Sequence, residues 1–480
     1  MDYTPYTAML PVAVIAAAAL MLVLLASFHR NHTAALLISL GGVVAAFVTL
    51  WLADSTMPLS TPLITVDHYA RLFTGLILAA TALIIPLLHG YLQKIDQPKE
   101  ELYIVLLLAT LGALVIIISA HFATFLLGLE VLTVSLYVMI SYLPESERSL
   151  EAGIKYFLLA AASSAFILFG MALIYARTGT MVFAEMSSRL GPLNGINELL
   201  FLSGFTLMLT GFGFKLAIVP FHMWTPDIYE GAPAPVSAYV ATVSKGTMFA
   251  ILYRFFLDIR GDDFSAVMVI FSLLAIASML TGNLLALWQN NVKRILAYSS
   301  IAHLGYLLVP LVAGGAMAAE SIIFYLVAYM ITMIAAFGIV TVLSRHDREP
   351  ESIEVYQGLY WSRPGLAAIF TAALLSLAGL PLTAGFIGKY LIVTAGIGSA
   401  KWLLVIILIV SSVIGLFYYL RIVVVMLSSA PAVEKRAKFG RVRLSSVVTL
   451  AIITLLLVGL GIYPVPLIDF IRTSVSTLFL

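Results

Sequence analysis

Long apolar runs alternate with short polar connections along the whole chain. A transmembrane helix needs about 20 mostly apolar residues, and runs of that length recur about 14 times. The predicted spans are residues 9–28, 33–52, 70–91, 102–120, 122–143, 153–175, 199–219, 236–257, 264–287, 292–313, 321–343, 364–395, 402–427 and 446–465. The pattern predicts an all-α, polytopic membrane protein whose residues 1–480 form a single membrane domain.

Two of these spans contain a predicted break. In one, Lys215 is followed by Pro220; the other reads LPLTAG at residues 380–385 and then reaches Lys389. Proline removes a helical hydrogen bond and clashes with the preceding turn, and irregular backbone at membrane depth needs protein or water to satisfy it. The lysine precedes the proline in the first break and follows it in the second, an order that fits inverted repeats with interrupted helices.

Composition narrows the possible functions. Apolar residues make up 62% of the chain and charged residues 10%, against roughly 25% charged in a soluble domain. The basic residues are spread over short loops, which argues against nucleic-acid binding. The sequence has no cysteine, which excludes disulfides, cysteine-ligated iron–sulfur clusters and thiolate metal sites within this chain. It also has no GxGxxG or Walker A pattern, so no nucleotide site is predicted.

The chain ends and loops predict an orientation. The first residues, MDYTPYTAML, are not basic, and their apolar run is longer than a signal peptide requires, so we expect a retained first span. The distribution of Lys and Arg favours both termini on the periplasmic side. The basic run Lys435–Arg443 would then face the cytoplasm, either near anionic lipid head groups or as an ordinary solvated loop.

Five ionisable residues lie inside apolar segments. Each such group costs at least ~2.5–3.5 kcal/mol in the bilayer centre, and such residues commonly mark ion or proton pathways. Our interpretation is proton transfer through the membrane. The candidates are Glu130, Lys215, Lys245, His303 and Lys389.

Glu130 and Lys215 are candidate partners. Thr133, Tyr137 and Ser141 follow Glu130 near one helical face and form a polar stripe. Burial destabilises the Lys215 ammonium group, whereas a nearby carboxylate stabilises it, so the two residues together could exchange a proton. Two alternatives are a protonated glutamate that only joins helices and a static buried ion pair.

The other three candidates suit successive steps of a pathway. Lys245 lies near the middle of an apparently continuous span, which suits a relay; His303 can pass a proton between its two nitrogens; Lys389 follows the second break and would control one exit. The hydroxyls of Ser299, Ser300 and Tyr306 fall on the same helical side as His303. The alternatives are snorkelling lysines and a satisfied core histidine.

Long segments of the chain resemble a known family. KLAIVPFHMWTPDIYEGAPAPVSAYVATVSK (215–245) and KRILAYSSIAHLGY (293–306) are similar to the antiporter-like membrane subunits of respiratory complex I and to related cation/proton antiporters. The similarity runs through the whole chain. RSLEAGIKYFLLAAASSAFILFGMALIYA (148–176) and LAGLPLTAGFIGKY (377–390) most resemble the N-type subunit of bacterial NADH–quinone oxidoreductase.

The resemblance implies an architecture of 14 core helices with two five-helix repeats of inverted topology. We place the first repeat at residues 102–257 and the second at 264–427, with flanking helices in 1–91 and 446–480.

The resemblance also implies roles for the five residues. Glu130 would pair with Lys215, Lys245 and His303 would continue a hydrated polar axis, and Lys389 would be the distal protonatable group.

The partners that the resemblance implies carry the electron chemistry. Iron–sulfur clusters, FMN and quinone would lie in partner subunits, with no cofactor and no metal in this chain. The neighbours would be other membrane and peripheral subunits of complex I, especially the antiporter-like subunit M and small membrane subunits, in the bacterial inner membrane. The chain would then translocate protons, driven by redox chemistry in its partners. The alternatives are a stand-alone cation/proton antiporter and a structural assembly scaffold.

Overall fold

Helices make up nearly all of the structure. The computed structural model describes residues 7–52, 59–95, 99–143, 146–190, 195–345, 349–429 and 442–476. The strands in these ranges, β1 (Leu59–Ser60) and β2 (Thr65–Val66), form one antiparallel pair. Most of the predicted basic loop Lys435–Arg443 lies outside the described residues.

The predicted membrane spans are confirmed. Within the described ranges, 13 helices are long and apolar enough to cross a membrane. Two shorter apolar helices, α17 (Pro364–Ala378) and α18 (Ala384–Gly398), occupy the predicted span 364–395 as the two halves of a broken helix. The all-α class and the count of about 14 spans therefore hold.

Close contacts divide the chain into two compact units. The first unit comprises residues 1–81, 100–224 and 243–271, and the second comprises 82–99, 225–242 and 272–480. This division differs from the predicted repeats 102–257 and 264–427, whose boundaries remain a prediction.

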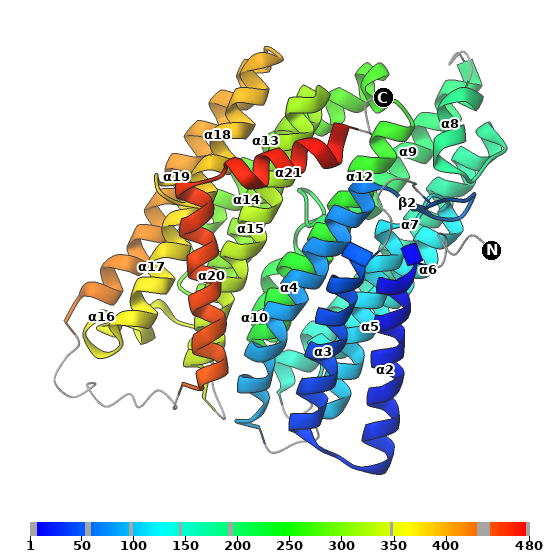
Figure 1. Ribbon diagram of the computed structural model, residues 1–480. Coiled ribbons are helices and arrows are strands. Elements are labelled where there is room, and N and C mark those ends of the chain that lie inside the picture. Colours follow the sequence, from blue (N-terminus) through cyan, green and yellow to red (C-terminus); the bar gives the residue numbers. More distant parts are fainter. Residues whose placement is uncertain are drawn as a thin grey trace. The chain divides into compact units, whose positions relative to one another are not determined.

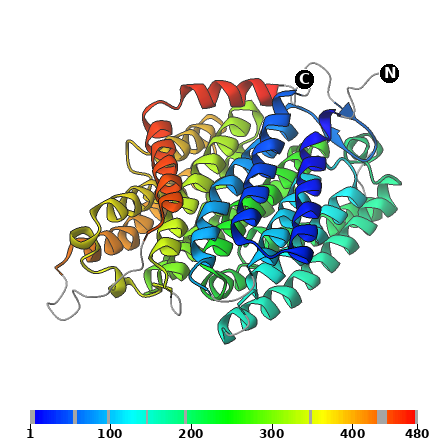
Figure 2. The same ribbon diagram turned by 60° about the horizontal axis from the view of Figure 1, so that its bottom comes forward.

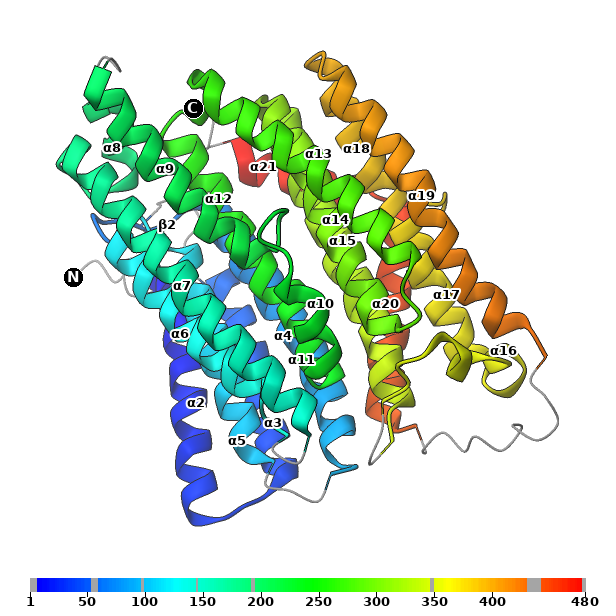
Figure 3. The ribbon, with the colours of Figure 1, turned by 180° about the vertical axis from the view of Figure 1, so that it is seen from behind.

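The first unit is built from helices that run mostly alongside one another. Its elements are α2 (Leu10–Phe28), α3 (His32–Leu52), the first part of α4 (His68–Leu92), α5 (Glu100–Ile117), α6 (Phe122–Ile140), α7 (Glu147–Thr178), α8 (Phe183–Leu190), α9 (Gly195–Leu216), α12 (Lys245–Asp258), the short turn η2 (Gly261–Asp263) and the start of α13 (Ser265–Leu287). The helix α5 packs on α2 and α6, and α7 lies along α9 (Figure 3).

The second unit contains two helices that are buried along their apolar lengths. Its elements are the end of α4, α10 (Trp224–Gly231), α11 (Ala234–Tyr239), the rest of α13, α14 (Val292–Ala313), α15 (Gly315–Leu343), η3 (Ile353–Tyr356), α16 (Leu359–Ser362), α17, α18, α19 (Trp402–Leu427), α20 (Leu444–Ile462) and α21 (Val465–Val475). The apolar windows of α14 and α15 are entirely buried, so any polar group on them needs a protein partner. Figures 1 and 2 show α21 turning sharply away from the end of α20.

Side chains fix where several helices begin. Asn291 accepts hydrogen bonds from the backbone N–H groups of Lys293 and Arg294, and so caps α14. Ser146 caps α7 in the same way through the N–H of Ser149. These caps set the register of helices that carry or contact the predicted site residues.

The first break follows α9. Ala217 has a left-handed backbone (φ 59°), and the Ile218 N–H bonds back to the Gly213 carbonyl at 2.8 Å. This pattern resembles a Schellman ending, in which glycine is usual at the left-handed position because a Cβ atom is unfavourable there. The Trp224 indole N–H also donates to the Phe214 carbonyl at 2.9 Å. The helix therefore ends with its last carbonyls satisfied, as the predicted break requires.

At the second break, which separates α17 from α18, the end of α17 has a related hydrogen-bond pattern. Gly379 (φ 82°) and Leu380 both donate backbone hydrogen bonds to the Leu375 carbonyl at 3.0 Å. The N–H of Gly385 donates to Ser376 Oγ at 3.1 Å. A Cβ atom on Gly385 would lie 1.9 Å from the Ser376 carbonyl oxygen, so the start of α18 touches the backbone of α17.

A third irregularity precedes Lys245. Residues Val240–Ser244 form a π-helical turn, η1, between α11 and α12. The predicted span 236–257 is therefore continuous, as expected, but its hydrogen-bond pattern changes one residue before the buried lysine. Single π-turns inside helices are frequent at functional sites.

Replacing Gly385 with alanine tests the second break. We expect Gly385→Ala to lower the free energy of unfolding by about 1–3 kcal/mol, since the new methyl group would force the two half helices apart. Gly365→Ala in α17 is the control, because a Cβ atom there meets nothing within 4 Å. Denaturation of the purified chain in mixed micelles measures both. Equal stability of the two variants would contradict the close contact.

Candidate functional site

Lys215 lies in the last turn of α9, directly before the first break. Its side chain is 4% exposed, and its ammonium group donates to Thr133 Oγ1 of α6 at 2.7 Å. The carboxyl end of a helix carries partial negative charge, which favours a cation. The helix ending thus supplies part of the compensation that a buried ammonium group needs.

Two aromatic rings lie near the same ammonium group. The Nζ atom is 5.9 Å from the ring centroids of both Tyr156 and Phe214, within the range of cation–π attraction. Trp224 packs edge-on against Tyr156 with centroids 5.5 Å apart. Lys215 therefore has one hydrogen-bonding hydroxyl and two aromatic rings near its ammonium group.

Glu130 lies one helical turn before Thr133. It is half-buried and interacts electrostatically with Lys215 and Tyr156. In the part of the chain that the structure describes, Lys215 and Glu130 are not within salt-bridge distance. Glu130 and Lys215 thus lie near each other in the first unit without direct contact. Thr133, a member of the predicted polar stripe, accepts the hydrogen bond from the ammonium group.

Lys245 begins α12, directly after the π-helical turn. Its side chain is fully buried in protein, which argues against snorkelling to an interface. A buried amine at a point where the helical hydrogen bonds shift by one residue suits the predicted relay position.

Lys389 is held by the second break. Its ammonium group donates to the carbonyls of Leu377 and Ala378 at 3.0 and 2.9 Å, and to Ser412 Oγ of α19 at 2.6 Å. The two carbonyls are the last of α17, so Lys389 of one half helix caps the carboxyl end of the other. The residue is only 8% exposed, and its ammonium group has these three oxygen partners. Both observations argue against a lysine that snorkels to an interface.

His303 lies on α14 among hydroxyl groups. Its Nδ1 is 2.6 Å from the Tyr325 hydroxyl of α15, and its Nε2 is 3.3 Å from the Tyr419 hydroxyl of α19. Tyr419 is also hydrogen-bonded to Ser299, which the sequence placed on the same helical side. His303 and Lys389 both belong to the second unit, and both meet side chains of α19.

Sequence reasoning missed the partners of these groups. Tyr325, Tyr419 and Ser412 were not predicted, although each places a hydroxyl inside an apolar span. That property was the available signal, since a hydroxyl buried in such a helix needs a partner. Glu130 and Lys215 are brought near each other in the first unit, and His303 and Lys389 each contact a side chain of α19 in the second.

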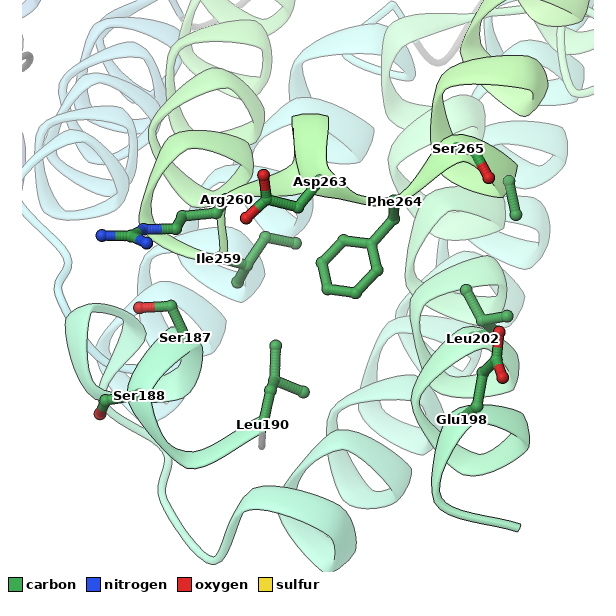
Figure 4. Close-up of a pocket in the computed structure, with 11 residues that line it drawn as sticks. Ser187, Ser188, Leu190, Glu198, Leu202, Ile259, Arg260, Asp263, Phe264 and Ser265 are labelled. Carbon is green, nitrogen blue, oxygen red and sulfur yellow. The ribbon is translucent and has the colours of Figure 1, made fainter. Parts of the chain in front are cut away.

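A pocket elsewhere in the first unit has different chemistry. It has a volume of about 580 Å³ and lies between α8, the start of α9 and the η2 turn (Figure 4). Apolar Leu190 and Phe264 line it together with charged Glu198, Arg260 and Asp263. None of the five candidate residues is among its lining residues, so it is separate from the buried lysines. Among the residues with described positions, no group of three His, Asp or Glu side chains could hold a metal ion.

The sequence of this chain matches a known family of membrane proteins. Residues 119–415, more than half of the chain, match the NADH:quinone oxidoreductase/Mrp antiporter transmembrane family. The chain belongs to this family. The matched segment contains all five candidate residues, and the resemblance inferred from the sequence is thereby confirmed.

Solved structures give the same fold. A chain of respiratory complex I from Thermus thermophilus with bound aureothin is 31% identical, with 96% of this chain and 98% of that chain covered and a TM-score of 0.81. A chain of the Mrp complex from Dietzia sp. DQ12-45-1b is 20% identical, with 100% and 98% covered and a TM-score of 0.85. A chain of the membrane-bound sulfane sulfur reductase, an archaeal respiratory membrane complex, is 24% identical, with 97% and 96% covered and a TM-score of 0.83.

Thr133 provides a direct test of the Lys215 site. We expect Thr133→Val to lower the free energy of unfolding by about 1.5–3 kcal/mol, because it removes the hydroxyl acceptor of a buried ammonium group without changing the side-chain volume much. Thr133→Ser keeps the hydroxyl and serves as the control. The measurement is denaturation in mixed micelles. A valine variant as stable as the serine variant would show that the hydrogen bond contributes little.

Proposed function

We propose that this chain is a proton-translocating, N-type membrane subunit of a bacterial NADH–quinone oxidoreductase. The observation that carries the proposal is the Lys215 site: a buried ammonium group at a helix break, bonded to Thr133, with Glu130 one turn away. Membership of the family and the 31% identity to a complex I chain support it.

The first unit would load and unload the proton. A carboxylate and an ammonium group attract each other by about 2 kcal/mol at 8 Å and about 4 kcal/mol at 4 Å when the effective dielectric constant is about 20. Moving one charge against 100 mV costs ~2.3 kcal/mol. A movement of Glu130 from about 8 Å to direct contact with Lys215 would therefore change the free energy of protonating Lys215 by about 2 kcal/mol, comparable to the cost of moving one charge against 100 mV.

The remaining residues would carry the proton onward. Lys245 would take it within the first unit, His303 would relay it in the second, and Lys389 would release or receive it at the second break. Redox chemistry in partner subunits, which would hold FMN, iron–sulfur clusters and quinone, would drive the shift of Glu130. Subunit M and small membrane subunits are the expected neighbours, in the bacterial inner membrane.

Substitution of Lys215 separates this proposal from a structural scaffold. We expect Lys215→Ala and Lys215→Arg to assemble but to lose most proton pumping, because arginine keeps the charge and does not release its proton. Pumping per electron is measured in vesicles that contain the assembled complex. Lys155→Ala is the control, since Lys155 forms an exposed pair with Glu151 at 2.7 Å. A scaffold would pump normally with arginine at 215, and that result would contradict the proposal.

A stand-alone cation/proton antiporter is the second candidate. The family description names Mrp antiporters, and the Mrp chain shares the fold over the whole length of this chain. The purified chain in liposomes distinguishes the two functions. Sodium- or potassium-stimulated proton exchange without partner subunits would favour the antiporter, and its absence alongside redox-driven pumping in the complex would favour the subunit.

A further inference from the structure

His303 has a tyrosine hydroxyl at each of its ring nitrogens. Tyr325 lies 2.6 Å from Nδ1, Tyr419 lies 3.3 Å from Nε2, and Tyr419 is hydrogen-bonded in turn to Ser299. All four side chains are buried in the second unit, at 4% exposure or less. They form a continuous hydrogen-bonded line that crosses from α15 through α14 to α19.

The distances indicate the direction of these hydrogen bonds. Hydroxyl donors approach their acceptors to about 2.5–3.0 Å, whereas N–H donors stay at about 2.7–3.2 Å. The 2.6 Å contact therefore fits donation from the Tyr325 hydroxyl to Nδ1. A neutral ring that accepts at Nδ1 carries its hydrogen on Nε2, which faces Tyr419. Tyr419 is the next group in the line, and its hydroxyl is hydrogen-bonded to Ser299.

Tyr306 packs against both His303 and Lys389 but is hydrogen-bonded elsewhere. The ring of Tyr306 lies 5.2 Å from the Lys389 ammonium group and 5.4 Å from the His303 ring centroid. Its hydroxyl is bonded to Asn283 at 2.9 Å and Ser411 at 3.4 Å. Tyr306 thus presents carbon atoms to both residues, while its hydroxyl is directed to Asn283.

We propose that protons cross His303 along the line Tyr325–His303–Tyr419–Ser299, which makes Tyr325 and Tyr419 relay residues. This inference rests on the proposed proton translocation and assigns the transfer across His303, whereas exchange at Lys389 is a separate step.

Each transfer along this line is balanced. An incoming proton binds the Tyr325 oxygen as the original Tyr325 hydroxyl hydrogen moves to Nδ1. The Nε2 hydrogen moves to the Tyr419 oxygen, the Tyr419 hydrogen moves to Ser299, and Ser299 passes its own hydrogen to the next proton acceptor of the pathway. One proton arrives and one leaves, and each bond broken is matched by one formed. Rotation of the hydroxyls and return of the imidazole to its first tautomer restore the starting state.

Phenylalanine substitutions in the assembled complex test the route. We expect Tyr325→Phe and Tyr419→Phe each to reduce pumping per electron to the level of His303→Ala. Because the groups act in series, combining Tyr325→Phe with His303→Ala should reduce it no further. Tyr329→Phe is the matched control: Tyr329 is equally buried on α15 and lies beside the His303 ring, but its hydroxyl is bonded to Ser300 at 2.6 Å. It should pump at nearly the wild-type rate.

The histidine tautomer gives a readout that does not depend on pumping. In the full chain labelled with ¹⁵N-histidine, NMR should show His303 with a bare Nδ1 and a protonated Nε2, assigned by loss of the signal in His303→Gln. Tyr329→Phe should keep this tautomer, and Tyr325→Phe should shift the population away from it.

The outcomes separate the route from the function. Normal pumping by both tyrosine variants, in a preparation where Lys215→Ala and His303→Ala are impaired, would overturn the route and leave the function standing. So would a wild-type ring with its hydrogen on Nδ1, or a Tyr329→Phe loss as large as that of the other two. Normal pumping by Lys215→Ala would instead overturn the proposed function and the route with it.

Discussion

Every buried ammonium group must be surrounded by oxygen atoms or π-electrons, and helix ends supply much of that surrounding in this protein. Lys215 lies in the last turn of its own helix, and Lys389 bonds the last two carbonyls of the helix that precedes its own. An unbroken helix uses its carbonyls internally and has none to offer a lysine at mid-span. The second break therefore supplies two acceptors that make the Lys389 charge tolerable, whereas Lys215 relies on Thr133 and on the partial negative charge of its helix end.

The two lysines nevertheless have different surroundings. Lys215 has one hydroxyl partner and two aromatic rings near it, with a carboxylate close by but not in contact. Lys389 has three acceptors in direct contact. A weakly coordinated amine next to a carboxylate responds strongly to small movements, whereas a fully coordinated amine resists them. The first arrangement suits a step that is driven, and the second suits a group that stays in position.

The sequence predicted the spans and breaks well because their signals are local. Apolar run length gives the helices, and Pro220 and the LPLTAG segment mark where they stop. The buried charges were also visible, since ionisable residues are rare in such runs. The π-helical turn before Lys245 has no such marker: Val240–Ser244 reads as ordinary apolar helix.

The partners of the charged groups could not be predicted because they are distant in sequence. Thr133 and Lys215 are separated by 82 residues, and His303 and Tyr419 by 116. The stripe containing Thr133 was recognised, but nothing local chose Thr133 over Tyr137 as the lysine's partner. Which pairs meet depends on how α6, α9, α14 and α19 pack, and apolar periodicity alone does not determine that.

The number of hydrogen-bond partners around the Lys389 ammonium group has a consequence for its two protonation states. An ammonium group has three N–H donors, and three oxygen acceptors surround this one. A neutral amine has two donors and a lone pair, and the Ser412 hydroxyl can turn to donate to that lone pair while the carbonyls of Leu377 and Ala378 accept the two remaining N–H groups. The junction between the two half helices therefore accommodates both forms of Lys389, and discharge of the lysine needs only the rotation of one hydroxyl group.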